Sequence, residues 1–204
     1  MENKMGNFRQ YINDSLNSML PELEVDNWDF ILKVHQELLK GQPISKEKCQ
    51  SIINLPNDKS DALLEKEAEF DTEGNIVAFS GLSLIPTKHK LIIENKTFYT
   101  WCAIDAILFT EQLDVVSIVQ SNDPIDSTPI ELKMKGNQLL WSNPYPLFVS
   151  WVESMNTCDI RNSFCNHVSF FASDTTSNQW LKEHPNGKVL TIDDFFESGK
   201  MGMK

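Results

Sequence analysis

Apolar residues recur at helical spacing through the first seventy positions of the chain. This pattern predicts four helices, over residues 8–20, 28–39, 45–55 and 58–70. Ser45 and Asp58 are placed to cap the third and fourth of these helices. A turn over DTEGN then separates two short strand-like pieces, EAEF and IVAFSGLSL. Helices followed by a hairpin give the outline of a winged helix-turn-helix.

From about Leu82 onward, short apolar segments alternate with turn residues, as strands do. KLIIEN and KTFYTW form a predicted hairpin that leads into a short apolar helix, CAIDAILFTEQL. The further predicted strands are VVSIVQS, PIELKMKG, NQLLWSN and LFVSWVES. After them, a helix capped by Asp174 or Thr175 is expected. The chain therefore predicts an α+β fold, in which an N-terminal helical, winged-helix-like domain (residues 1–80) precedes a mixed, mostly antiparallel α/β domain (residues 81–204).

The charge balance argues against nucleic acid as a partner. The 204 residues carry 18 Lys and Arg against 29 Asp and Glu, a formal net charge of −11. Residues 1–80 hold eight basic against fifteen acidic residues, so the phosphate contacts that position a DNA-reading helix are missing. A DNA-binding regulator is therefore the disfavoured interpretation of the winged outline, and a packing or lid role is preferred.

No apolar run approaches the length of about 20 residues that a membrane span needs, and the N-terminus lacks the apolar core of a secretory signal. The four cysteines are widely spaced, without a CxxC pair, in a chain too long to depend on disulfides. We therefore expect a cytoplasmic protein without membrane contact, whose cysteines are free thiols.

Cys102 and Asp105 stand three residues apart in the apolar segment WCAIDAILF. On a helix, this spacing places both side chains on one face, a turn apart. Taken alone, Cys102 has the ordinary interpretation of an inert buried cysteine. Asp105 needs more explanation, because an ionised carboxylate inside an apolar helix is unfavourable unless it is paired or protonated. Either a distant Arg or Lys reaches it, or its pKa is raised and it is a candidate proton donor.

A second segment, DIRNSFCNHVSFFAS, carries Arg161, Cys165 and His167. His167 is either a ligand or base, or an ordinary core histidine. Arg161 pairs either with Asp105 or with a surface carboxylate. Two buried thiols with a carboxylate suit a soft metal ion, whereas magnesium or calcium would need a cluster of oxygens and a structural zinc four ligands.

At these two segments the chain resembles the organomercurial (alkylmercury) lyases of bacterial mercury resistance. FYTWCAIDAILF at 98–109 and DIRNSFCNHVSFFAS at 159–173 carry the resemblance, and residues 38–56 and 71–84 add weaker similarity. These segments span most of the chain in one order. The pair WCAxD and SFCxHVxFFAS is specific to that family.

The resemblance implies an enzyme that cleaves the carbon–mercury bond by protonolysis, giving a hydrocarbon and Hg(II) for mercury detoxification. By position, Cys102 would be the thiolate that first takes the organomercurial, Cys165 the second thiol and Asp105 the proton shuttle. The same three residues would hold the Hg(II) product. No organic cofactor is implied, but exogenous thiol would bring in substrate and help to remove product. The family's downstream partner is a mercuric reductase, which takes Hg(II) by thiol exchange.

The chain also departs from the family. It has Gln120 where many members have another cysteine, and Cys165-Asn166 where some have Cys-Cys; neither change touches the catalytic trio, so activity is expected to survive. Cys158 is an extra thiol with an expected surface or core role, and Cys49 is expected in the core. The alternative function is a non-catalytic, thiol-based protein that binds or senses soft metals on the same scaffold. Such a site would have no need of a buried acid.

Overall fold

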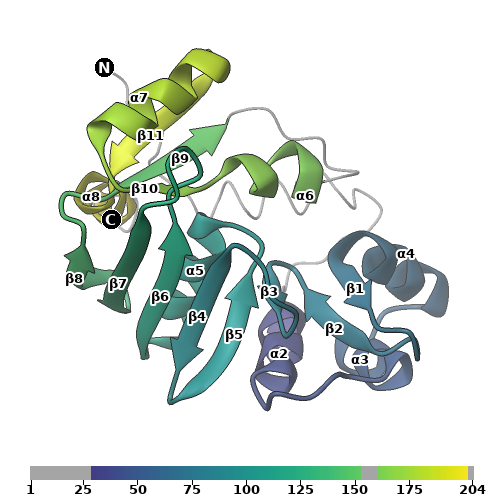
Figure 1. Cartoon of the computed structure of the whole chain (residues 1–204). Coiled ribbons are helices and arrows are strands. Elements are labelled where there is room, and N and C mark those ends of the chain that lie inside the picture. The colour runs from purple at the N-terminus through teal and green to yellow at the C-terminus, as the bar shows by residue number, and fades with distance from the viewer. Residues whose placement is uncertain (1–28, 153–159, 202–204) are drawn as a thin grey trace.

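The computed structural model describes residues 29–152 and 160–201, whose strands form two antiparallel sheets (Figure 1). The larger sheet has the order β1-β2-β3-β5-β4-β6-β7-β8, and the smaller has the order β10-β9-β11. Bounds in the larger sheet are β1 (Ala68–Phe70), β2 (Ile76–Phe79), β3 (Leu82–Ser83), β4 (His89–Ile93), β5 (Lys96–Thr100), β6 (Val116–Asn122), β7 (Pro129–Lys135) and β8 (Gln138–Asn143). Bounds in the smaller sheet are β9 (Phe148–Val152), β10 (Phe170–Phe171) and β11 (Gly187–Thr191).

The described helices agree with most of those predicted. Their bounds are α2 (Asp29–Leu38), α3 (Lys46–Ile53), α4 (Asn57–Glu67), α5 (Ala103–Leu113), α6 (Ile160–Ser163), the short 3-10 helix η1 (Cys165–His167), α7 (Asp174–Glu183) and α8 (Ile192–Met201). The predicted helix over residues 8–20 and the thiol of Cys158 lie outside the described residues. The α+β class with mostly antiparallel sheets is confirmed.

Two predicted helix caps are wrong. Helix α4 begins one residue before Asp58, after Pro56, and Pro56 makes no side-chain cap. Asp58 instead lies in the first turn, where its negative charge favours the helix N-terminus. Helix α7 is capped by Ser173, whose hydroxyl accepts a hydrogen bond from the Thr176 backbone N–H at 3.1 Å, so Asp174 is already helical. The cap of α7 lies one residue before Asp174, because neighbouring Ser, Asp and Thr residues have similar capping preferences. The N-cap of α4 lies two residues before Asp58, at Pro56, which supplies no side-chain cap.

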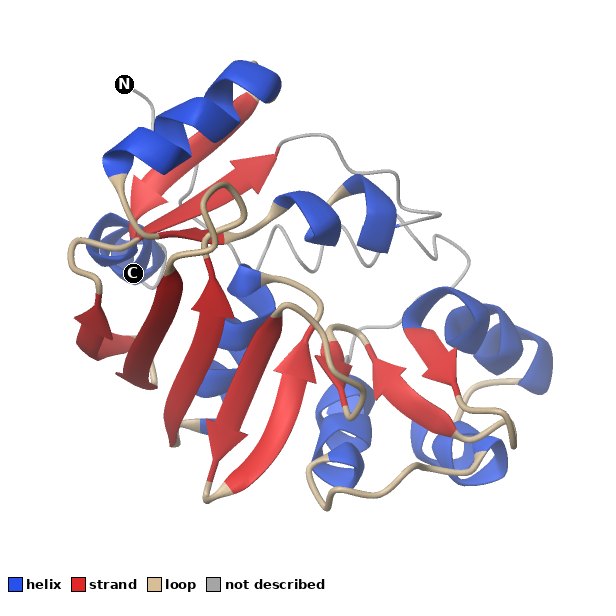
Figure 2. Ribbon diagram, viewed as in Figure 1, coloured by secondary structure: helices blue, strands red, loops and turns tan. Residues whose placement is uncertain are grey.

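The larger sheet runs without a break from the N-terminal helical segment into the C-terminal part of the chain (Figure 2). Strand β3 pairs with β2 on one side and with β5 on the other. Helix α2 packs beside β2 and β3, while α5 lies along one face of β4 to β7. The N-terminal end of α5 is thereby held close to the β2–β3 turn, which matters for the site described below.

A tight turn sets the register of the strands that lead into α5. Glu94 and Asn95 have φ angles of 49° and 65°, the positive values of a two-residue hairpin turn between β4 and β5. Along β6 and β7 buried residues alternate with partly buried or exposed ones, and the buried residues Val119, Leu132 and Met134 belong to the same core as α5. The predicted hairpin and the apolar helix that follows it are confirmed.

Asp123 joins the two sheets from the end of β6. Its buried carboxylate accepts hydrogen bonds from the Ala172 backbone N–H at 2.8 Å and from the Thr176 hydroxyl at 2.6 Å, near the start of α7. Asp123→Ala would leave these donors without their acceptor, so we expect a loss of about 3 kcal/mol in the free energy of unfolding in urea. Asp126→Ala is the matched control, because exposed Asp126 lies in the same loop; it should cost far less. An equal loss in the two variants would contradict this role.

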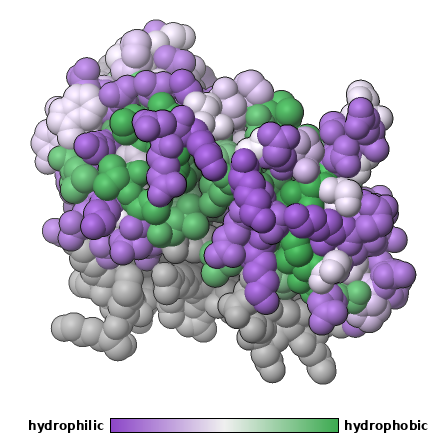
Figure 3. Space-filling model, turned by 90° about the horizontal axis from the view of Figure 1, so that it is seen from below, coloured by the Kyte–Doolittle hydropathy of each residue, from purple (hydrophilic) through white to green (hydrophobic). Residues whose placement is uncertain are grey.

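No described helix is long and apolar enough to cross a membrane. On the face seen from below, apolar side chains occur in patches between polar ones (Figure 3).

Candidate active site

Cys102 is the N-cap of α5 and precedes the helix itself. The spacing of Cys102 and Asp105 predicts instead that both residues lie on one face of the helix. Its backbone is extended, with φ −142° and ψ 172°. The Cys102 sulfur accepts from the Asp105 backbone N–H at 3.4 Å, and the Asp105 carboxylate accepts from the Cys102 backbone N–H at 3.0 Å. This is the reciprocal arrangement of a capping box, with cysteine in the place of serine or threonine. The local structure at the start of α5 therefore brings the thiol and the carboxyl together.

Cys165 comes to the same place from a distant part of the chain. It begins η1, which follows α6, and its backbone C=O accepts from the Val168 N–H at 3.1 Å. The Val168 C=O in turn accepts from the Ala103 N–H at 3.2 Å, at the first residue of α5. Ser150 on β9 ties this segment to the smaller sheet, because its hydroxyl donates to the His167 C=O at 2.9 Å. Two backbone bonds thus fix Cys165 relative to Cys102.

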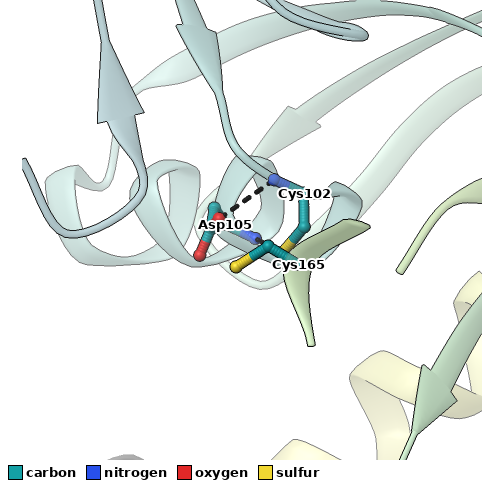
Figure 4. A group of neighbouring side chains, drawn as sticks. All are labelled: Cys102, Asp105 and Cys165. Atoms are coloured by element: carbon teal, nitrogen blue, oxygen red, sulfur yellow. Dashed lines mark hydrogen bonds between the residues drawn. The ribbon is translucent and has the colours of Figure 1, made fainter. Parts of the chain in front are cut away.

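The three predicted site residues converge (Figure 4). One ligand atom from each of Cys102, Asp105 and Cys165 lies within 4.8 Å of the others, and they form the one such group of three potential metal ligands within residues 29–152 and 160–201. Cys102 is fully buried and Cys165 is 6% exposed, whereas Asp105 is partly exposed. The carboxyl is therefore the member of the group that lies nearest to solvent.

Burial changes the proton affinity of two of these groups. Burial, and after it the hydrogen bond with Cys165 and the charge of Asp105, raise the pKa of the Cys102 thiol above its usual range. Burial also raises the pKa of Asp105 to about 6, although the hydrogen bonds from Cys102 act in the opposite direction. With that pKa, about one Asp105 carboxyl in ten holds a proton at pH 7. The site therefore combines a protonated thiol with a carboxylate that takes up and releases protons near neutral pH.

Arg161 does not pair with Asp105. Its guanidinium forms an ion pair with Glu69 on β1 and lies 5.2 Å from the ring centroid of Trp101, the residue before Cys102. Of the two predicted partners, the surface carboxylate is the one observed, since the side chains of Arg161 and Glu69 are 39% and 30% exposed. Two explanations were open for a carboxyl in this apolar segment, a distant cation or a raised pKa. Since Arg161 pairs elsewhere, the structure supports the raised pKa.

The remaining residues singled out in the sequence lie outside the group of three. The His167 ring is partly buried and hydrogen-bonded to the His184 ring at 3.2 Å. Gln120 donates to Glu131 at 2.7 Å across β6 and β7. Cys49 is fully buried on α3, and burial raises the pKa of its thiol to about 12, as expected of an unreactive core cysteine.

Two further residues lie beside the site, Glu67 and Gly81, and the sequence pattern indicates neither of them. Glu67 is a buried carboxylate at the end of α4, and its charge adds to the raised pKa of Asp105. Gly81 lies in the β2–β3 turn against the Asp105 carboxyl. Neither stands close to Cys102 in the sequence. Glu67 belongs to the charged run EKEAE, and Gly81 lies inside the strand-like piece IVAFSGLSL, where a glycine is the one local signal of a turn.

The chemistry of the group favours a soft ion. Two thiols bind soft, polarisable metals such as mercury far better than hard cations, and a closed zinc site would need a fourth ligand. The adjacent carboxyl has no necessary place in a passive thiolate site, but it is a proton donor and acceptor within 4.8 Å of the two sulfurs.

Comparison with known proteins agrees with this chemistry. The alkylmercury lyase family model matches residues 82–204. The chain is 32% identical over 168 residues to the alkylmercury lyase of Bacillus cereus, covering 81% of this chain and 77% of that one. It is 33% identical over 167 residues to that of Streptomyces lividans, with the same coverage. The crystal structure of the mercury-bound form of MerB2 has the same fold, with a TM-score of 0.73 at 18% identity over 92% of this chain and 95% of that one. The chain belongs to the alkylmercury lyase family.

Proposed function

We propose that this protein is an organomercurial lyase, which cleaves the carbon–mercury bond of alkyl- and arylmercury compounds to a hydrocarbon and Hg(II). The observation that carries the proposal is the convergence of Cys102, Asp105 and Cys165 within 4.8 Å, in a chain of this family. Two sulfurs hold the mercury, and the carboxyl supplies the proton that the departing carbon needs.

The two thiols act in turn. The Cys102 sulfur displaces the labile ligand X of R–Hg–X, so a sulfur–mercury bond forms, the mercury–X bond breaks, and the thiol proton leaves with X. The Cys165 sulfur then binds the same mercury, and its proton passes to the Asp105 carboxylate. A second thiolate raises the electron density in the mercury–carbon bond and so prepares the carbon to accept a proton.

Asp105 completes the reaction. Its proton moves to the carbon as the carbon–mercury bond breaks, and the bonding electron pair stays with the carbon. Hydrocarbon leaves, mercury stays on two thiolates, and Asp105 is a carboxylate again. A pKa of about 6 suits this role, because a group that titrates near the working pH both accepts and donates protons readily.

The same chemistry implies how the product leaves the site. No organic cofactor takes part; two exogenous thiols exchange with the bound Hg(II) and return protons to Cys102 and Cys165. A mercuric reductase is the proposed acceptor of the product, and the thiol-rich cytoplasm is the proposed location.

The proposed arrangement of residues 1–80 is winged-helix-like, in keeping with α2, α3 and α4 followed by the β1–β2 hairpin.

The test is turnover with phenylmercuric acetate in excess thiol, with benzene measured by gas chromatography. We expect more than one equivalent of benzene per protein chain. Tight binding of mercury without benzene would contradict the proposal and favour the alternative, a thiol-based binding or sensing protein. The presence of Asp105 beside the thiols speaks for the lyase, since a binding site for soft metals gains nothing from a neighbouring acid.

A further inference from the structure

Gly81 lies in direct contact with the Asp105 carboxyl. It follows Ser80 in the turn between β2 and β3, and its φ is +93°. A Cβ at this position would lie 2.7 Å from Asp105 Cγ and 2.8 and 2.9 Å from its two oxygens. All three distances are too short for real side chains, so the carboxyl occupies the space that any other residue at position 81 would fill.

Gly81 also contacts the segment that enters the helix. Its C=O accepts from the Trp101 backbone N–H at 2.9 Å, one residue before Cys102. One residue thus fixes the chain leading to the first thiol and borders the carboxyl that lies beside that thiol.

The turn that presents Gly81 is held by a buried acid. Glu67 at the end of α4 is 5% exposed, and its carboxylate accepts from the Ser80 hydroxyl at 2.9 Å. The Glu67 backbone C=O accepts from the Ser80 N–H at 2.8 Å. Burying a carboxylate is unfavourable unless it is hydrogen-bonded. The bond from the Ser80 hydroxyl therefore stabilises buried Glu67 and, at the same time, holds the turn in place. Ser80 itself has a φ of 41°, so two successive residues of the turn have a left-handed backbone.

We propose that Gly81 is a positioning residue for protonolysis: the absence of a side chain keeps the Asp105 carboxyl directed at the two sulfurs, and Glu67 holds Gly81 in place through Ser80. This inference rests on the proposed function. Proton transfer requires the donor oxygen to lie within hydrogen-bond reach of the group that it serves. A side chain at position 81 would displace the carboxyl, because the three nearest atoms that its Cβ would meet all belong to Asp105 and none is a sulfur.

The test compares Gly81→Ala with Gly74→Ala. Gly74 has a similar φ of +82° but open space where its Cβ would be, so both variants carry the backbone strain and only Gly81→Ala meets Asp105. For Gly81→Ala we expect kcat for benzene release from phenylmercuric acetate to fall about 100-fold, the scale of a misplacement by about 1 Å. Its binding of one Hg(II) in competition with thiol should be unchanged. Gly74→Ala should keep both properties.

A second pair of variants covers failure of Gly81→Ala to fold. Glu67→Ala removes the acceptor for Ser80 and should lower kcat without lowering Hg(II) binding, whereas Glu67→Gln keeps an acceptor and should restore most of the rate. Equal rates in Glu67→Ala and Glu67→Gln, or a rate for Gly81→Ala equal to that of Gly74→Ala, would overturn the proposal.

The proposal is also tested without turnover. Crystals of Gly81→Ala should show the Asp105 carboxyl displaced from Cys165, and those of Gly74→Ala should show it in place; an undisplaced carboxyl in Gly81→Ala would overturn the inference. A wild-type protein that releases no benzene would instead count against the proposed function.

Discussion

Replacement of either Cys102 or Cys165 by serine is expected to abolish hydrocarbon release, with a loss of at least about 100-fold in turnover. A hydroxyl is a hard, weakly acidic ligand, and mercury is a soft ion that prefers sulfur. Serine is also a good N-cap, so Cys102→Ser should still accept from the Asp105 N–H and keep the start of α5 folded. The loss would therefore report on chemistry and not on unfolding. Benzene release from phenylmercuric acetate in excess thiol measures it.

Cys49→Ala is the matched control for the two serine variants. Cys49 is equally buried but lies on α3, away from the group of three. Its replacement should leave turnover unchanged even if stability falls. Near-wild-type turnover in Cys102→Ser or Cys165→Ser would show that the two thiols do not have the roles proposed for them.

Asp105→Asn is expected to separate mercury binding from bond cleavage. An amide has no proton to give at neutral pH, so benzene release should fall by about 100-fold or more while one Hg(II) still binds to the two thiols. The amide oxygen can still accept from the Cys102 N–H, so the helix start should be kept. Mercury binding by competition with thiol and benzene release are the two measurements. Normal release would show that the proton comes from another group.

The same variant should be more stable than the wild type at neutral pH. Asp105 has a pKa of about 6 in the folded chain against an ordinary value of 3.8. Because the unfolded chain loses this proton first, the wild type becomes less stable as pH rises from about 4 to about 6, and the full cost is present above that range. Allowing for partial exposure, Asp105→Asn should gain about 2 kcal/mol in the free energy of unfolding at pH 8. The gain should shrink towards zero as pH falls to 4; a gain independent of pH would contradict the raised pKa.

Local signals in the sequence accounted for the helices and hairpins. Helical periodicity and capping residues indicated α2 and α3, and alternation with turn residues indicated the β4–β5 hairpin and strands β6 to β8. These elements depend on interactions between residues a few positions apart, and such interactions are visible in a linear pattern. The cap of α7 was shifted by one residue because Ser173, Asp174 and Thr175 compete for the same role, whereas α4 begins after Pro56, which supplies no side-chain cap.

Contacts between residues far apart in the sequence could not be predicted from these local patterns. The sequence left two partners open for Arg161, and only the fold brings Glu69 and the Trp101 ring to it. Sequence spacing placed Cys102 within the helix, whereas the structure makes it the N-cap. Two hydrogen bonds with Asp105, each from a backbone N–H to a side chain, fix both groups there. A side chain's partner in space is decided by how sheets and helices pack, and packing has no fixed separation in sequence.

The sequence by itself determined the residue types that the chemistry needs: two thiols and an acid in apolar segments, with the family resemblance that these segments carry. The tertiary structure alone decided that Cys165 lies beside Cys102, through the backbone bond between Ala103 and Val168, and that Gly81 leaves room for the Asp105 carboxyl. It also decided the proton affinity of Asp105, because burial raises the pKa of a carboxyl and burial is a property of the folded chain.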